Sequence, residues 1–165
     1  MTVHHSFKVA LVIFASVASS VAWAAPQLEL EIKAEKEIEV ETDGTTEVQR
    51  VVAEKVEPGQ VVFYTLTYRN VGDSVANNIK LKDAFPENTT YEAGSAWGDG
   101  AVIEFSIDQA ESFKKPSMLK YQVESVDGEK EEKEASVENY THIRWVVDSV
   151  PAGSEGQVGY SVTVN

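Results

Sequence analysis

The clearest run of strand-forming residues spans residues 61–70 (VVFYTLTYRN), between the turn-forming pairs Pro58-Gly59 and Gly72-Asp73. One face of this run would carry Val62, Tyr64, Leu66 and Tyr68, all apolar or aromatic, and the other face is mixed. Side chains alternate between the two faces of a strand, so we expect the first face in a core and the second half covered. β-Branched and aromatic residues also favour strand over helix. The pattern predicts the central strand of a β-sandwich.

Residues 28–40 alternate more regularly than any other segment. The even positions are apolar apart from Lys36, and every odd position is Glu or Lys. A helix would scatter these apolar residues around its circumference, so the period of two predicts a strand despite the helix propensity of Glu and Lys. The run is long for one strand, and we therefore expect a break or bulge near Lys36 that lets its two halves join different sheets.

Asp43-Gly44 predicts a hairpin turn after this strand. A two-residue loop would place Val40 opposite Glu47, whereas a three-residue loop would place it opposite Val48. The apolar match favours the longer loop, with Gly44 in the left-handed conformation.

The rest of the chain continues in short apolar runs separated by Pro and Gly turns. Further strands are expected at about 47–56, 76–83, 89–91, 102–107, 119–126, 140–147 and 158–164. In the last two, the alternation predicts one shared face each, formed by Thr141, Ile143, Trp145 and Val147 and by Val158, Tyr160, Val162 and Val164. Residues 94–100 are predicted as a loop, and the charged run 129–134 (EKEEKE) as a solvated loop or hairpin tip. The sum is an all-β chain with seven to nine strands, for which an antiparallel two-sheet β-sandwich is the economical architecture.

The first 24 residues are typical of an export signal. Residues 9–21 are apolar but too few to span a bilayer stably, and Ala22-Trp23-Ala24 places small residues where a signal peptidase reads them. We predict cleavage after Ala24, since a cut after Ala25 would leave Pro26 beside the scissile bond; an uncleaved anchor is the alternative that the length opposes. Residues 25–165 then form a single domain, with 25–56 an N-terminal strand and hairpin and 57–165 the core.

Charge and cysteine content limit the cellular compartments and the kinds of partner that we expect for this chain. The chain has 27 acidic against 14 basic residues, a net charge of −13, and no cysteine. Such a field repels phosphate backbones and anionic bilayers, so we expect no nucleic-acid partner and no membrane insertion after cleavage. We expect a bacterial periplasmic, extracellular or cell-surface protein whose core is stable without disulfides.

The segment VEPGQVVFYTLTYRNVGDSVANNIKLKDAFPENTTYEAGSA resembles the bacterial conserved repeat domain, known as domain of unknown function eleven. The motifs that carry the resemblance are Pro58-Gly59, the strand at 64–70, Gly72, the strand at 76–83 and Phe85-Pro86. The resemblance implies an immunoglobulin-like fold in exported proteins, often in tandem copies, and it implies no activity.

Three later pieces, EFSID (104–108), YTHIRW (140–145) and PAGSEGQVGYSV, are similar to one proteobacterial branch of that family. This chain departs from the tandem pattern in holding one copy, which argues against a long stalk. It also carries Gln109-Ala110 where the branch has Gly-Gly, so a looser turn is expected there.

Candidate chemistry is sparse. His142 would be the only histidine after cleavage, a nucleophile motif such as G-x-S-x-G is missing, and we predict that the chain is not an enzyme. Calcium is the better metal hypothesis because the chain offers oxygen ligands, with Asp73, Asp83 and Asp99 as candidates. Trp97, in the loop that also holds Asp99, could contact a sugar or a protein.

We therefore expect an exported, non-enzymatic structural or protein-interaction module, with no catalytic, cofactor or metal residues assigned. An envelope protein would bind through loop tips or an edge strand such as the closing one at 158–164. The alternative is a calcium- or carbohydrate-binding domain that uses the loop around Trp97 and Asp99.

Overall fold

The computed structural model describes residues 25–42, 44–124, 127 and 129–165; the predicted signal 1–24 lies outside them. Within this part of the chain the helical elements are two short 3-10 turns, and every other regular element is a strand. The elements are β1 (Leu28–Thr42), β2 (Thr45–Val52), β3 (Val61–Asn70), β4 (Ala76–Ala84), β5 (Thr89–Tyr91), β6 (Trp97–Gly98), β7 (Val102–Ser106), η1 (Pro116–Met118), β8 (Lys120–Glu124), β9 (Lys130–Glu134), η2 (Val137–Asn139), β10 (His142–Val150) and β11 (Glu155–Val164).

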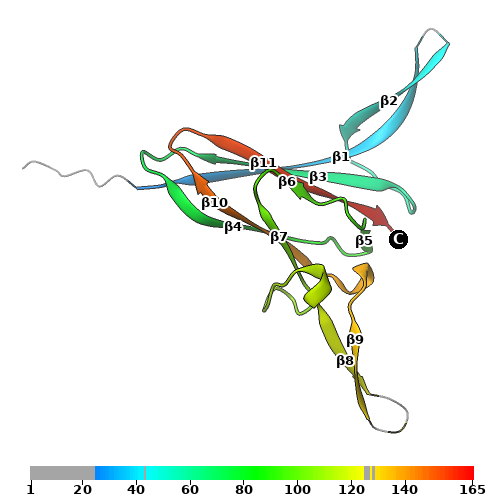
Figure 1. Ribbon diagram of the computed structural model, residues 1–165. Coiled ribbons are helices and arrows are strands. Elements are labelled where there is room, and N and C mark those ends of the chain that lie inside the picture. Colours follow the sequence, from blue (N-terminus) through cyan, green and yellow to red (C-terminus); the bar gives the residue numbers. More distant parts are fainter. Residues whose placement is uncertain (1–24, 43, 125–126, 128) are drawn as a thin grey trace, which may run out of the picture.

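The eleven strands form three antiparallel sheets (Figure 1). The large sheet has the order β2-β1-β3-β11-β5, with β6 also paired to β11; the small sheet has the order β4-β10-β7; and β8 and β9 form a hairpin. The predicted all-β, antiparallel class is confirmed, but seven to nine strands was too few. The two extra strands, β6 and β9, lie in segments predicted as loops. Neither has a buried face, so neither leaves an apolar alternation that a sequence pattern can detect.

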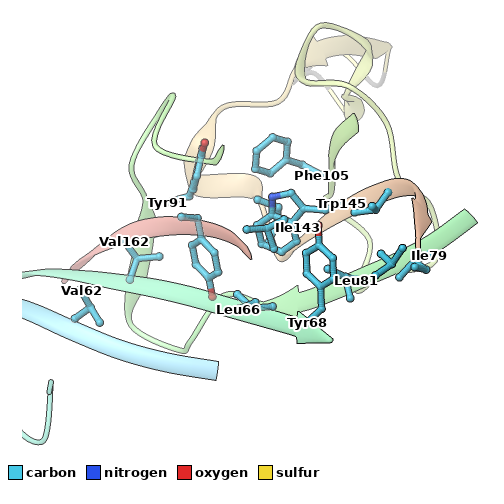
Figure 2. Packing of buried hydrophobic residues seen from close by; sticks show 14 of the residues in the cluster. Val62, Leu66, Tyr68, Ile79, Leu81, Tyr91, Phe105, Ile143, Trp145 and Val162 are labelled. Carbon is cyan, nitrogen blue, oxygen red and sulfur yellow. The ribbon is translucent and has the colours of Figure 1, made fainter. Parts of the chain in front are cut away.

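The large and small sheets face each other across one core (Figure 2). Leu66, Val158 and Val162 from the large sheet and Ile143 and Trp145 from the small sheet are completely buried. The ring centroids of Trp145 and Tyr160 lie 6.0 Å apart. The predicted core faces of β3, β10 and β11 are confirmed, with Tyr64 half-buried and stacked on Tyr160 at 5.0 Å.

The expected break in β1 is wrong. Its residues 28–36 pair with β3 and its residues 35–42 pair with β2, both in an unbroken register and within a single sheet. The ladder with β3 ends at the pair Lys36 and Val62, and β1 continues beyond it into a hairpin with β2 that projects from the facing sheets (Figure 1). The length of the strand therefore reflects a change of partner and not a bulge.

The predicted three-residue loop of this hairpin is also wrong. Thr42 pairs with Thr45, and Val40 lies opposite Glu47. Val48 consequently points to the other face, where it is 63% exposed. An apolar match enforces register only where one face of a hairpin is buried. Here both faces are largely exposed, so the short turn sets the register, with Gly44 at φ +77°.

Gln109 and Ala110 both adopt the left-handed backbone that glycine adopts most readily, with φ values of 57° and 67°. Ser106 Oγ donates to the Asp108 carboxylate at 2.6 Å, and the backbone N–H of Ala110 donates to Ser106 Oγ at 3.0 Å. Hydrogen bonds from Ser106 and then Ser112 lower the pKa of Asp108 to about 2. The expected looser turn is therefore wrong: side-chain hydrogen bonds hold two left-handed residues that have no glycine.

Candidate interaction surface

The first half of β1 carries an apolar row that points toward the core side of the large sheet but is not covered. In the ladder with β3, Leu30 pairs with Tyr68 and Ile32 pairs with Leu66, so the four side chains share a face. Leu66 and Tyr68 are 0% and 7% exposed, whereas Leu28, Leu30 and Ile32 are 40%, 49% and 50% exposed. We call Leu28, Leu30 and Ile32 the open flank.

The open flank exists because the small sheet has too few strands to cover it. The small sheet makes hydrogen bonds to β3 and β11 of the large sheet. Asn70 Nδ2 of β3 donates to the carbonyl of Val150 in β10 at 2.9 Å, and Tyr160 Oη of β11 donates to Asp83 Oδ2 in β4 at 2.9 Å. β1 lies one strand further out in the large sheet, beyond β3. Phe105 of β7 packs against Tyr91 of β5, with ring centroids 5.0 Å apart, so β7 lies toward the β5 end of the large sheet and β4 is the edge nearer to β1. A fourth strand beside β4 would be needed to complete the cover.

Within the described part of the chain, β4 is an edge strand that pairs with β10 alone. An edge strand presents one row of N–H and C=O groups that have no partner in its sheet. Along β4, the buried Ile79 and Leu81 alternate with the exposed Lys80 and Lys82. Exposed lysines are a common protection against uncontrolled strand pairing, and they also select for acidic residues in any strand that does pair.

Lys80 and Lys82 form a basic strip on a chain whose net charge is −13. In the ladder with β10, Lys82 lies opposite Arg144. Arg144 is already paired with Glu104, at 2.5 Å from Nη2 to Oε2, and its guanidinium lies 4.3 Å from the Phe113 ring. Among the residues that the structure describes, neither lysine of β4 forms an ion pair. Both are therefore open to a new acidic partner.

The closing strand, which the sequence suggested as a free edge, is an interior strand. β11 pairs with β3 along one side and with β5 and β6 along the other. The expectation that the closing strand offers an edge is wrong, because the loop between β4 and β7 returns two short strands to it. The edge that sequence reasoning missed is β4, which reads as an ordinary half-buried strand and gives no sign of how many neighbours it has.

The structure places Trp97 against β11 with its ring partly open to solvent. A Cβ added to Gly159 would lie 2.7 Å from Trp97 Nε1, so the ring occupies the space that glycine leaves there. The carbonyl of Trp97 accepts a hydrogen bond from Trp145 Nε1 at 3.0 Å, and the side chain is 45% exposed. Its backbone thus belongs to the core while its ring lies on the outer face of the large sheet.

The three candidate calcium ligands are not brought together. Asp73 accepts from the backbone N–H of Ala25 at 2.8 Å, Asp83 accepts from Tyr160 in the core, and Asp99 lies close enough to Tyr68 to raise the pKa of that phenol, second to burial. Across the described ranges no group of three or more His, Asp or Glu side chains is positioned to hold a metal ion. The acidic residues have separate structural partners.

His142 lies at the start of β10, and its Nδ1 is 3.1 Å from Thr141 Oγ1. Burial raises the pKa of Asp83, while the hydrogen bond from Tyr160 and the proximity of His142 oppose that rise. Burial and the Asp83 charge raise the pKa of Tyr160 strongly. Deprotonating that phenol is therefore unfavourable, and the contact serves as a hydrogen bond between the sheets.

Comparison with known proteins finds no matching family model, no matching curated protein and no matching solved structure. The resemblance to the conserved repeat domain therefore stays a prediction. The part of the chain that the structure describes contains no helix long and apolar enough to cross a membrane.

Proposed function

We propose that this chain is an exported, non-enzymatic protein-interaction module of the periplasm or cell surface that binds an extended segment of an envelope partner along β4. The observation that carries the proposal is the open flank of Leu28, Leu30 and Ile32 beside an edge strand that has one free side. An apolar row on the core side of a sheet is an incomplete core, and a strand added to β4 would complete it.

The chemistry of the partner segment follows from the two faces of β4. Side chains of an added strand that point inward would meet Leu30 and Ile32, and those that point outward would lie beside Lys80 and Lys82. The segment we propose therefore alternates apolar with acidic residues. Main-chain hydrogen bonds to β4 would supply affinity, and the lysines would supply selectivity.

An immunoglobulin-like sandwich of the conserved repeat family is the fold that we propose for this module. Its support is the pair of facing antiparallel sheets, between which the chain crosses from β3 to β4 and from β10 to β11. Support for export is the predicted signal at 1–24 together with a cysteine-free, acidic composition. Fractionation of the native host should recover the protein from the envelope or the medium.

The binding proposal can be tested with synthetic peptides and the purified chain 25–165. The probe is a ten-residue peptide that alternates Ile or Val with Glu, and the control peptide carries Lys in place of Glu. We expect the acidic peptide to bind, the Lys80→Glu/Lys82→Glu variant to lose at least about tenfold in affinity, and the lysine peptide to prefer that variant. Fluorescence anisotropy measures the affinities, and hydrogen exchange should show new protection along β4.

Two further variants separate the open flank from general stickiness. Leu30→Gln should weaken peptide binding, whereas Val48→Gln, at an exposed apolar residue of β2, should not. Failure of the acidic peptide to bind, or equal binding by all variants, would contradict the proposal. If the chain self-associates and Lys80→Glu/Lys82→Glu abolishes that association, the partner at β4 is a second copy of this chain and not an envelope protein.

A carbohydrate at Trp97 is the second candidate, and the exposed ring on the outer face of the large sheet is the observation that favours it. Phe63, with the Arg50 guanidinium 3.9 Å from its ring, lines the same shallow hollow as Trp97. Aromatic faces commonly stack on sugar rings. Thermal stabilisation by envelope glycans that Trp97→Ala abolishes and Lys80→Glu/Lys82→Glu retains would support this candidate over strand addition.

A further inference from the structure

The first described residues lie on the loop that follows β3. The backbone N–H of Ala25 donates to Asp73 Oδ1 at 2.8 Å, and the N–H of Val71 donates to the carbonyl of Gln27 at 2.8 Å. The N–H of Gln27 in turn donates to Asn70 Oδ1 at 3.3 Å. Ala25 and Gln27 are thus hydrogen-bonded to Asn70, Val71 and Asp73.

Gly72 is needed at this place for close approach and not for its backbone angles. A Cβ on Gly72 would lie 2.3 Å from the carbonyl oxygen of Ala25 and 2.5 Å from the nitrogen of Gln27. Both neighbours are backbone atoms, which cannot turn aside as a side chain could. The loop is therefore shaped around the segment 25–27.

Asn70 supplies a rigid base for this arrangement. Its side chain is fully buried, and its Nδ2 donates to the carbonyls of Ser74 at 2.7 Å and Val150 at 2.9 Å. Its Oδ1 accepts from the N–H groups of Gly72 and Gln27. All the hydrogen-bonding atoms of this amide are used, which fixes the loop that presents Asp73.

We propose that Asp73 is the receptor for the α-ammonium group that export processing creates on Ala25. Hydrolysis of the peptide bond between Ala24 and Ala25 adds water, leaves a carboxylate on Ala24, and leaves an amine on Ala25 that takes up a proton at neutral pH. The nitrogen that donates to Asp73 as a neutral amide then donates as a cation, and a charge-assisted hydrogen bond forms. A cut after Ala25 would remove this donor, so the geometry points to Ala25 as the first residue.

This inference rests on the proposed export and adds a consequence for the binding surface. Among the residues that the structure describes, residues 28–33 of β1 pair with β3 alone, because the ladder with β2 begins at Glu35 and Ala34 accepts a hydrogen bond from the N–H of Ala53. The same residues carry the open flank, so little else holds them in place. The ion pair at Ala25 fastens the free end of this half-strand, and processing thereby completes the surface beside β4.

A double-mutant cycle on the chain 25–165 tests the receptor. One form begins at Ala25, and the other carries Gly-Ser-Ala before it, which moves the ammonium about 10 Å away, roughly one screening length at physiological salt. At pH 6.5 we expect the form that begins at Ala25 to unfold at a midpoint about 1–4 °C higher, and Asp73→Asn to remove that difference. Asp148→Asn, at an exposed carboxylate of β10, is the matched control and should leave the difference intact.

The pH dependence separates a charge pair from a merely structural contact. At about pH 10.5 the α-amino group, whose ordinary pKa is about 8, is neutral, and the difference between the two forms should vanish. Glu29, Arg69 and Glu155 are the other charged groups at this end, and the cycle cancels them because every form carries them. Persistence of the difference in Asp73→Asn, or at pH 10.5, would overturn the receptor.

Mass spectrometry of the protein recovered from its native envelope or medium gives an independent check. A first residue at Ala25 supports the inference, and any other start overturns it. If Asp73→Asn removes the stability difference but no peptide binds at β4, the role of Asp73 is supported and the proposed binding function is contradicted. If the peptide binds but Asp73→Asn leaves the stability difference unchanged, the binding function is supported and the role of Asp73 is contradicted.

Discussion

At the scale of single residues, Asp83 and Tyr160 form a hydrogen bond that joins the two facing sheets. Asp83 belongs to β4 and Tyr160 to β11, and Tyr160 Oη donates to the carboxylate at 2.9 Å. The pKa of Asp83 is raised chiefly because burial disfavours its charged form. The contact therefore positions the sheets while the buried charge weakens the folded state at neutral pH.

Tyr160→Phe should destabilise the protein by about 1–3 kcal/mol, because it removes the donor to Asp83 Oδ2 and leaves only the Ala84 N–H on that carboxylate, while keeping the aromatic packing. Urea unfolding at pH 7 measures the free energy. The matched variant is Tyr121→Phe in the exposed hairpin, which should change stability little. Equal effects of the two variants would show that the bond to Asp83 contributes nothing.

Asp83→Asn should change how stability depends on pH. A carboxyl group whose pKa is raised in the folded state stabilises that state most below its unfolded value of about 4, and this contribution is lost as the pH rises through the folded value. The stability of the variant relative to the original chain should therefore increase as the pH rises from about 4 to 7. Urea unfolding across this pH range measures the effect, with Asp148→Asn as the control. If the free energies of unfolding of the two variants changed with pH in the same way, the raised pKa of Asp83 would not contribute to stability.

At the scale of elements, β1 serves two roles with a single pattern. Its residues 28–36 extend the large sheet at β3, and its residues 35–42 form a hairpin with β2 away from the core. The apolar row looks the same throughout, yet its members are exposed to different extents because their surroundings differ. Ala34 is partly buried and packs against the core cluster, whereas Leu28, Leu30 and Ile32 are exposed.

Alanine substitution at Leu30 and Leu66 tests this difference between neighbouring strands. The two residues are identical in type and lie on the same face of the large sheet. Leu66→Ala should cost about 2–5 kcal/mol, since it empties a buried site, and Leu30→Ala should cost about 1 kcal/mol or less. Equal costs in chemical unfolding would mean that the open flank is covered in solution.

At the scale of the whole molecule, two hairpins project from a core made of two facing sheets (Figure 1). Among the described residues, β8 and β9 pair only with each other, and β9 is exposed along its whole length. The base of this hairpin is closed by a bond from the N–H of Ala135 to the carbonyl of Leu119, which is buried. The stability of the molecule therefore belongs to the core and not to this hairpin.

Replacing residues 120–134 by Asn-Gly, a sequence favoured in two-residue turns, should leave the unfolding midpoint within about 3 °C of the original. The base at Leu119 and Ala135 stays in place, so the core loses no buried side chain. Replacement of β5 and its loop (residues 87–92) by a short Gly-Ser linker removes the buried Tyr91 and should unfold the chain. Circular dichroism melting measures both, and a large loss from the first change would contradict the hairpin's independence.

Local pattern was enough to determine the class of fold and much of the core. The alternation in β3, β10 and β11 identified Leu66, Trp145, Val158 and other core residues, because a strand with one buried face must repeat every two residues. The same reasoning missed β6 and β9, since a strand without a buried face leaves no such repeat.

Which apolar residues are covered was decided only by the tertiary structure. Alternation in β1 shows that Leu28, Leu30 and Ile32 share a face, but burial depends on whether a strand of the opposite sheet lies above them. The register of the β1-β2 hairpin, the interior position of β11 and the free edge of β4 have the same origin. Each depends on contacts between segments far apart in the chain, and a periodicity within one segment carries no information about those contacts.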